Sequence, residues 1–127
     1  MVNFENLKLV ALGNPLLDMQ VRDGQDVLQK YGLKPNDAVL ASPEQLSIYE
    51  HLVENYQVTY VAGGAAQNTA RCAQYALPEG STAYLGCVGN DDLAQQLRAA
   101  NEREGLQSVY QVVNDTPTGS CAVVITG

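Results

Sequence analysis

The stretch "VAGGAAQNTA" at residues 61–70 joins a predicted strand to a predicted helix. The run that enters it, residues 58–62, is rich in β-branched and aromatic side chains and favours a strand. Gly63 and Gly64 break this strand, because paired glycines permit a sharp turn and let a ligand approach the backbone closely. The helix that follows, over about residues 66–77, would present the N–H groups of its first turn to a hydroxyl or an anion. The same pattern also fits a tight turn with a packing glycine, and both interpretations stay open.

A second turn, "GNPLLD" at residues 13–18, follows the apolar run of residues 9–12. A short continuous apolar run is typical of a strand that is buried on both faces. Asp18 then places a carboxylate shortly after the end of that strand. Asp18 is either a surface acid in a turn or a ligand-binding acid. The second alternative follows from its position, because open α/β sheets bind ligands at the carboxyl ends of their strands.

Much of the remaining chain alternates between helices and strands. A capping box that starts at Ser42 opens a helix reaching Tyr56. Residues 82–88 favour a strand, and the helix after it begins near Asn90 and ends at Gly105. This alternation predicts βα units on a mostly parallel sheet.

Three further segments do not fit the rhythm of that sheet. Met19 and Val21 alternate with polar neighbours, as in a half-exposed strand. Residues 108–113 and 120–126 have the pattern of two strands joined as a hairpin. We therefore expect a separate small sheet that contains these segments.

The composition limits the classes of function. The 127 residues include 14 acids against 7 bases, which gives a net charge of −7. This balance disfavours binding to nucleic acid or to an anionic membrane, because both need a clustered basic surface. No stretch reaches the roughly 20 apolar residues of a membrane span, and the N-terminus carries no secretory signal. We expect a soluble, intracellular protein with one core.

Several familiar catalytic patterns are missing. The sequence contains neither GxGxxG nor GxxxxGK[ST], the two common nucleotide-binding loops. Its 3 cysteines include no CxxC pair, which argues against a disulfide framework or a zinc knuckle and favours buried thiols. His51 is the only histidine, and no nucleophile elbow accompanies it, so we interpret it as a surface residue.

Three stretches together resemble the ribokinase-like (PfkB) carbohydrate kinases: "GNPLLD" at 13–18, "VAGGAAQNTA" at 61–70 and "YLGCVGNDDLAQQL" at 84–97. Two more, "LKPNDAVLA" at 33–41 and "TPTGSCAVVITG" at 116–127, narrow the resemblance to the adenosine kinase branch of that family. The segment "GGAAQNTAR" is similar to fungal members. The resemblance covers nearly the whole chain.

The resemblance implies an α/β fold of the ribokinase-like type. It would be the N-terminal part of a doubly wound, mostly parallel sheet with helices on both faces, together with strands of a small β-sheet lid. The lid strands would be residues 18–23, 108–113 and 119–126, and the remainder of residues 1–127 would be α/β core of an incomplete domain. Family members continue with an ATP-binding part and a GAGD motif that carries the catalytic base. The base is therefore expected beyond Gly127, and the chain alone is expected to be inactive.

The activity implied is transfer of the γ-phosphoryl group of ATP, with Mg²⁺, to the 5′-hydroxyl of adenosine, giving AMP in purine salvage. Asp18 would accept hydrogen bonds from the ribose 2′- and 3′-hydroxyls, which suits a carboxylate with two oxygens. The other substrate-binding residues implied are Asn14, Gly64 and Asn68 at the ribose, Gly63 in the turn, and Leu16, Leu40 and Cys121 as apolar walls. The family implies no metal ligand in this chain. The full-length protein is expected to be a monomer in the cytoplasm, and also in the nucleus.

Two alternatives stay open. One is a ribokinase- or fructokinase-like enzyme that phosphorylates a free sugar. The other is a catalytically inactive nucleoside-binding fragment.

Overall fold

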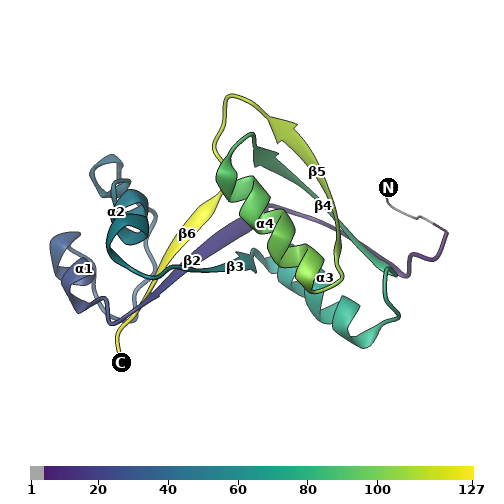
Figure 1. The fold of residues 1–127 in the computed structure, drawn as a ribbon, viewed down its shortest axis with the longest axis horizontal. Coiled ribbons are helices and arrows are strands. Elements are labelled where there is room, and N and C mark those ends of the chain that lie inside the picture. Colours follow the sequence, from purple (N-terminus) through teal and green to yellow (C-terminus); the bar gives the residue numbers. More distant parts are fainter. Residues whose placement is uncertain (1–4) are drawn as a thin grey trace. The chain divides into compact units, whose positions relative to one another are not determined.

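The computed structural model describes residues 5–127, and the chain divides into two compact units. Unit 1 comprises the residues up to Leu17 together with Tyr60–Ser120, and unit 2 comprises Asp18–Thr59 and Cys121–Gly127. Figure 1 labels the helices and strands of both units. None of the helices in the described part of the chain is long and apolar enough to cross a membrane.

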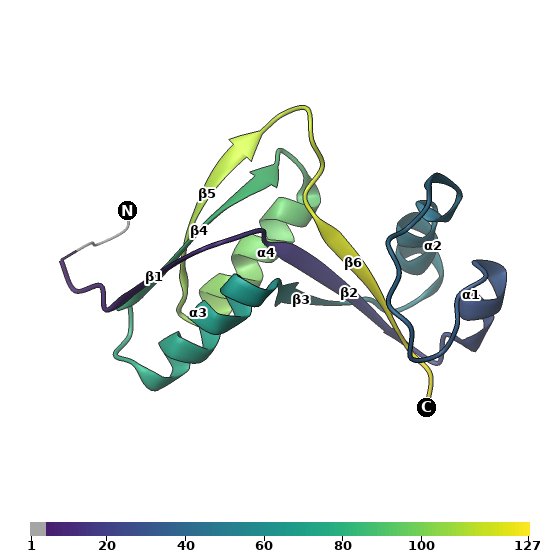
Figure 2. The ribbon, with the colours of Figure 1, turned by 180° about the vertical axis from the view of Figure 1, so that it is seen from behind.

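Unit 1 contains a three-stranded parallel sheet with the order β1-β4-β5 (Figure 2). Its strands are β1 (Leu9–Leu12), β4 (Thr82–Gly89) and β5 (Gln107–Val113). Parallel neighbours need a crossover connection, and α4 (Asp92–Arg103) supplies the one between β4 and β5. The βα unit predicted from the alternation of strands and helices is therefore confirmed here.

Two helices, α3 (Ala65–Ala76) and α4, pack on the same face of this sheet. Ala70 of α3 and Leu97 of α4 belong to one buried cluster with Tyr84 and Tyr110 of the sheet. The alternate side chains of β1 point the other way, so that Leu12 is 76% exposed. Helices were expected on both faces of the sheet. Within residues 5–127, helices cover one face only.

A second sheet has the order β3-β2-β6. Its strands are β3 (Thr59–Gly63), β2 (Leu16–Arg22) and β6 (Ser120–Ile125). Every second residue of β2 is buried, namely Leu17, Met19 and Val21. The prediction of a separate small sheet with a half-exposed strand near residue 20 is confirmed.

The assignment of residues 108–113 to that small sheet is wrong. β5 pairs with β4 along its whole length, from Ala83 opposite Gln107 to Gly89 opposite Val113. It therefore forms no hairpin with β6, which lies in the other sheet. Conversely, β3 was expected in the parallel sheet and belongs to the second one. Local sequence indicates that a segment is a strand, but its partner depends on residues distant in the sequence.

Unit 2 carries α1 (Gln25–Lys30), a short 3-10 helix (Pro43–Gln45) and α2 (Ile48–Asn55). One continuous helix was expected from the capping box at Ser42 to Tyr56. The capping contact exists, since Gln45 Oε1 accepts from the Ser42 backbone N–H at 3.0 Å. Gln45 Nε2 also donates to Tyr31 O at 2.9 Å, and the first turn stays 3-10. The core of this unit comprises Val21, Val27, Ile48 and Leu52.

Candidate functional site

The two glycine-containing turns of the sequence meet in unit 1. Gly64 has φ +93°, which L side chains rarely adopt. A Cβ at this position would lie 2.5 Å from the carbonyl oxygen of Asn14 and 3.4 Å from the backbone nitrogen of Leu16. The turn after β1 and the turn before α3 are therefore in direct backbone contact. This contact brings together three residues that were predicted to bind substrate.

The N-terminus of α3 lies against the end of β1. A Cβ on Gly13 would be 2.7 Å from the Cβ of Ala66, so only glycine fits there. The helix begins at once after the turn, because the Asn68 N–H already donates to Gly64 O at 2.8 Å. The N–H groups of the preceding residues have no partner within a helix, and together with the helix dipole they favour an anion or an oxygen ligand.

Gln67 holds the glycine turn from the buried side. Its Nε2 donates to Gly63 O at 2.7 Å, and its side chain is fully buried. Its Oε1 accepts from Asn101 Nδ2 at 3.0 Å and from the Tyr110 hydroxyl. Asn101 also donates to Ser108 Oγ at 2.8 Å. The turn is thus tied to α4 and β5 through a buried polar network.

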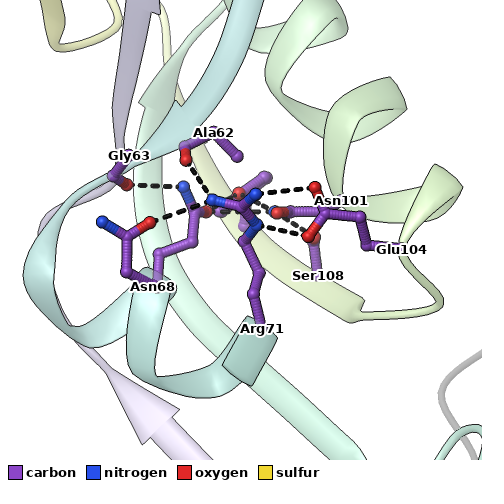
Figure 3. Close-up of polar contacts among 9 residues, drawn as sticks. Ala62, Gly63, Asn68, Arg71, Asn101, Glu104 and Ser108 are labelled. Carbon is purple, nitrogen blue, oxygen red and sulfur yellow. Dashed lines mark hydrogen bonds and ion pairs between the residues drawn. The ribbon is translucent and has the colours of Figure 1, made fainter. Parts of the chain in front are cut away.

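Arg71 holds the same turn from the other side. Its Nη1 donates to Ala62 O, the residue before the glycine pair, and to Asn68 Oδ1 at 3.0 Å. Its Nε and Nη2 donate to the two carboxylate oxygens of Glu104, each at 2.6 Å. Figure 3 shows the guanidinium between these groups. The side chain of Asn68 is exposed.

The loop between β5 and β6 is attached to the turn at the end of β4. Asp91 accepts from the backbone N–H of Thr118 at 2.8 Å and from its hydroxyl at 2.6 Å. Thr118 Oγ1 in turn accepts from Gly89 N at 3.0 Å. Asp91 is the N-cap of α4, since it accepts from Ala94 N at 2.9 Å, and the helix thus begins close to the start expected near Asn90.

That loop also touches the first glycine turn. A Cβ on Gly119 would lie 2.9 Å from Leu16 Cδ2 and 3.0 Å from Pro15 O. The motifs around positions 14, 64, 90 and 118, which are far apart in the sequence, therefore converge in unit 1. They lie at the carboxyl ends of β1 and β4. Open α/β sheets bind their ligands at this end of the strands.

Unit 2 contains the other three residues that were predicted to bind substrate: Asp18, Leu40 and Cys121. Asp18 lies in β2 and Cys121 in the neighbouring strand β6. Partial burial and, secondly, the charge of Asp18 raise the pKa of the Cys121 thiol. The structure thus brings Asp18 and Cys121 together.

Leu40 is 97% exposed, in a segment without regular secondary structure. A cavity of about 730 Å³ is lined by Val39 and Cys121 but not by Leu40. Its role as an apolar wall therefore stays a prediction.

The three thiols differ from expectation. Cys72, Cys87 and Cys121 are all free and exposed, whereas buried thiols were expected. Successive residues of a strand point to opposite faces of the sheet. Since the neighbouring Val88 is buried, Cys87 points to the face of β4 that α3 and α4 leave open.

No group of three or more His, Cys, Asp or Glu side chains in residues 5–127 could hold a metal ion. We therefore assign no metal ligand to these residues. Sequence reasoning missed the positioning side chains Gln67, Arg71, Asp91 and Thr118. For Gln67 and Arg71 a signal existed, since helical spacing from Gly63 and Asn68 places them next to the turn.

The model of the pfkB family carbohydrate kinases matches residues 26–127. The chain belongs to this family. It is 61% identical over 120 residues to an adenosine kinase of the fungus Schizophyllum commune, covering 94% of this chain and 35% of that protein. The chain thus spans about a third of the length of the curated relatives it matches. The resemblance to adenosine kinases, including fungal ones, is confirmed.

Solved structures show the same fold. Anopheles gambiae adenosine kinase, in complex with P1,P4-di(adenosine-5) tetraphosphate, superposes with a TM-score of 0.82 at 42% identity, over 94% of this chain and 36% of that one. Schistosoma mansoni adenosine kinase, in complex with adenosine and AMP, superposes with a TM-score of 0.78 at 30% identity, over 91% and 35%. The α/β, ribokinase-like fold class is therefore confirmed.

Proposed function

We propose that the protein containing this chain is an adenosine kinase, which transfers the γ-phosphoryl group of ATP to the 5′-hydroxyl of adenosine and releases AMP and ADP. The observation that carries the proposal is the 61% identity to an adenosine kinase along 94% of the chain. The contact between Asn14 and Gly64 supports it, because it joins two of the motifs that carry the resemblance.

The chain would supply the part that holds the nucleoside. Asp18 accepts hydrogen bonds from the ribose 2′- and 3′-hydroxyls, and a carboxylate can accept from both at once. The remaining proposed contacts are Asn14, Gly64 and Asn68 at the ribose, Gly63 in the turn, and Leu16, Leu40 and Cys121 as apolar walls. Phosphoryl transfer depends mainly on placement and charge stabilisation, so these contacts act by fixing the position of the 5′-hydroxyl.

The lid proposed for this fold would include residues 18–23 and 119–126, which overlap strands β2 and β6 of the second sheet. ATP and Mg²⁺ complete the proposed reaction. The described residues offer no cluster of metal ligands, and none of them is assigned to Mg²⁺. The 127 residues contain no segment that matches the GAGD motif, which carries the catalytic base in this family. We therefore expect no AMP formation by the isolated 127-residue chain, tested with contaminating kinases excluded.

The proposal is tested with the product of the complete gene. Adenosine and ribose are offered separately with Mg²⁺ and ATP, and the products are separated by chromatography. Formation of AMP with little ribose phosphate supports the proposal. Turnover of ribose alone would favour a sugar kinase, and adenosine binding without turnover of either would favour an inactive nucleoside-binding protein.

Asp18 is tested by Asp18→Ala in the same protein. Loss of this charged hydrogen-bond acceptor should reduce the stabilisation of the transition state by about 2–4 kcal/mol. The value of kcat/KM for adenosine should therefore fall roughly 30- to 1,000-fold. The matched control is Asp92→Ala, an exposed acid in the first turn of α4. An Asp18 variant with the kcat/KM of the control would remove Asp18 from the ribose site.

The location and assembly of the protein are proposals as well. We propose a monomer in the cytoplasm, with a further pool in the nucleus. Light scattering during size-exclusion chromatography measures the mass in solution, and imaging of a fluorescent fusion shows the location. A dimer mass or a membrane pattern would contradict these proposals.

A further inference from the structure

The amide of Asn68 is held in one orientation by Arg71. Arg71 Nη1 donates a hydrogen bond to Asn68 Oδ1 at 3.0 Å. A guanidinium has only donors, so the oxygen of the amide must be the atom that faces it. In Figure 3, Nδ2 of Asn68 accordingly points away from Arg71. The exposed side of the Asn68 amide therefore offers two hydrogen-bond donors.

The guanidinium that sets this orientation is itself fixed. Its Nε and Nη2 form a bidentate ion pair with Glu104, with both distances at 2.6 Å. A bidentate pair defines the plane of the guanidinium, which a lysine ammonium cannot do. The third nitrogen, Nη1, is shared between Asn68 Oδ1 and the carbonyl of Ala62. The side chain of Arg71 is 19% exposed, so most of it is shielded from water.

We propose that Arg71 is a positioning residue for substrate binding, which turns the Nδ2–H groups of Asn68 towards a substrate hydroxyl. The proposal rests on the proposed function, in which Asn68 contacts the ribose. A hydroxyl oxygen that accepts from Nδ2 keeps its own proton free to donate to a carboxylate. Reversal of the amide would present an acceptor instead, and the hydroxyl could not then satisfy two acceptors with one proton.

The test uses the product of the complete gene and steady-state kinetics with adenosine. Arg71→Met removes the donor that orients the amide, and Arg103→Met removes an exposed arginine of α4 as a control. Asn68→Ala and the double variant Arg71→Met/Asn68→Ala complete the set. Melting temperatures are recorded for every variant. If Arg71→Met is insoluble, Arg71→Lys takes its place, because it keeps a charge near Glu104 without the planar fork.

We expect Arg71→Met to raise KM for adenosine about tenfold and to change kcat less than about twofold, as for a lost contact made equally in the ground and transition states. In the Asn68→Ala background the same change should raise KM less than about twofold, because its effect passes through Asn68.

Two results would overturn the proposal. One is a soluble Arg71 variant with the KM of the Arg103→Met control. The other is a tenfold rise in KM that persists in the Asn68→Ala background, since this would show an effect independent of the amide. A wild-type protein that forms no AMP would instead refute the proposed function itself, before any variant is compared.

Discussion

Asp91 binds Thr118 through both of its carboxylate oxygens. Oδ2 accepts from the Thr118 backbone N–H at 2.8 Å, and Oδ1 accepts from its hydroxyl at 2.6 Å. Oδ1 also caps α4 by accepting from Ala94 N at 2.9 Å. One side chain thus begins a helix and attaches the loop that leads from β5 to β6.

Replacement of this acid by its amide should destabilise the protein. Asp91→Asn substitutes a donor for one acceptor oxygen, so at least one of the three hydrogen bonds is lost. We expect a loss of about 1–2 kcal/mol in the free energy of unfolding, measured by urea denaturation. Asp92→Asn, at the exposed neighbouring position, is the control and should change it by less than about 0.5 kcal/mol.

The same acid should contribute a pH dependence. Burial acts to raise the pKa of Asp91, but the hydrogen bonds from Thr118 and Ala94 outweigh it, and the net pKa lies below the usual 3.8. A group with a lowered folded-state pKa stabilises the protein above its unfolded-state pKa and ceases to do so as the pH falls through the folded value. Wild-type stability should therefore decline more steeply below about pH 4 than that of Asp91→Asn. Parallel acid-unfolding curves would contradict this.

Gly64 should not tolerate a side chain. Gly64→Ala combines a φ of +93° with a Cβ placed 2.5 Å from Asn14 O, so strain and a backbone clash add together. We expect destabilisation by about 2–4 kcal/mol and displacement of the turn after β1. Gly32→Ala is the matched control, because Gly32 has φ +63° but no atom within 4 Å of its Cβ position. It should cost only about 1 kcal/mol, and equal losses would show that the clash is relieved cheaply.

The buried amide of Gln67 should matter more for stability than its size indicates. Gln67→Leu leaves Gly63 O, Asn101 Nδ2 and the Tyr110 hydroxyl without this partner in a buried position. We expect a loss of about 2–3 kcal/mol in the free energy of unfolding. Gln96→Leu makes the same replacement at an exposed position of α4 and should be nearly neutral. A Gln67 variant as stable as this control would mean that the network does not hold the turn.

The phenol of Tyr110 should ionise at a higher pH than that of an ordinary tyrosine. Burial raises the pKa of Tyr110 to about 12. Since an unfolded tyrosine ionises near pH 10, the stabilising contribution of the protonated folded form is present below about pH 10 and is lost between about pH 10 and 12. The pKa of Tyr84 is raised by burial and that of Tyr56 by its hydrogen bond to Asp26, so Tyr110 is identified by substitution. Absorbance at the tyrosinate band should show a late ionisation that loses one phenol in Tyr110→Phe. Tyr75→Phe removes a phenol that is 96% exposed and should leave the late step in place.

Local patterns predicted the elements well. The strand at residues 82–88, the helices around Gly63–Gly64 and before Gly105, and the half-buried strand near Met19 all exist as expected. Each depends on side-chain periodicity or on a glycine with positive φ, which neighbouring residues determine. The start of α4 was expected near Asn90, and the observed N-cap is the next residue, Asp91. Both side chains are good caps, so the local sequence does not distinguish them.

Partners at long range were not predictable in the same way. Val109 and Val123 lie in segments of similar composition, yet one segment joins the parallel sheet and the other the second sheet. The polar side chains that hold the glycine turn were also missed. Helical spacing places Gln67 and Arg71 next to the turn, but an exposed glutamine or arginine has the same spacing. Only their contacts with Asn101 and Glu104 at α4 show that these side chains hold the turn.

The sequence by itself determined the class of the fold and the family, through the motifs that resemble the family. It also determined the positions of the two glycine-containing turns, because glycine and asparagine encode the backbone geometry of a turn locally. Only the tertiary structure decided which strands pair and which side chains orient those turns. Asn14 touches Gly64, and Asp91 binds Thr118, because the folded chain brings separate turns to the same end of a sheet. Such contacts depend on distance in space, which residue order alone does not specify.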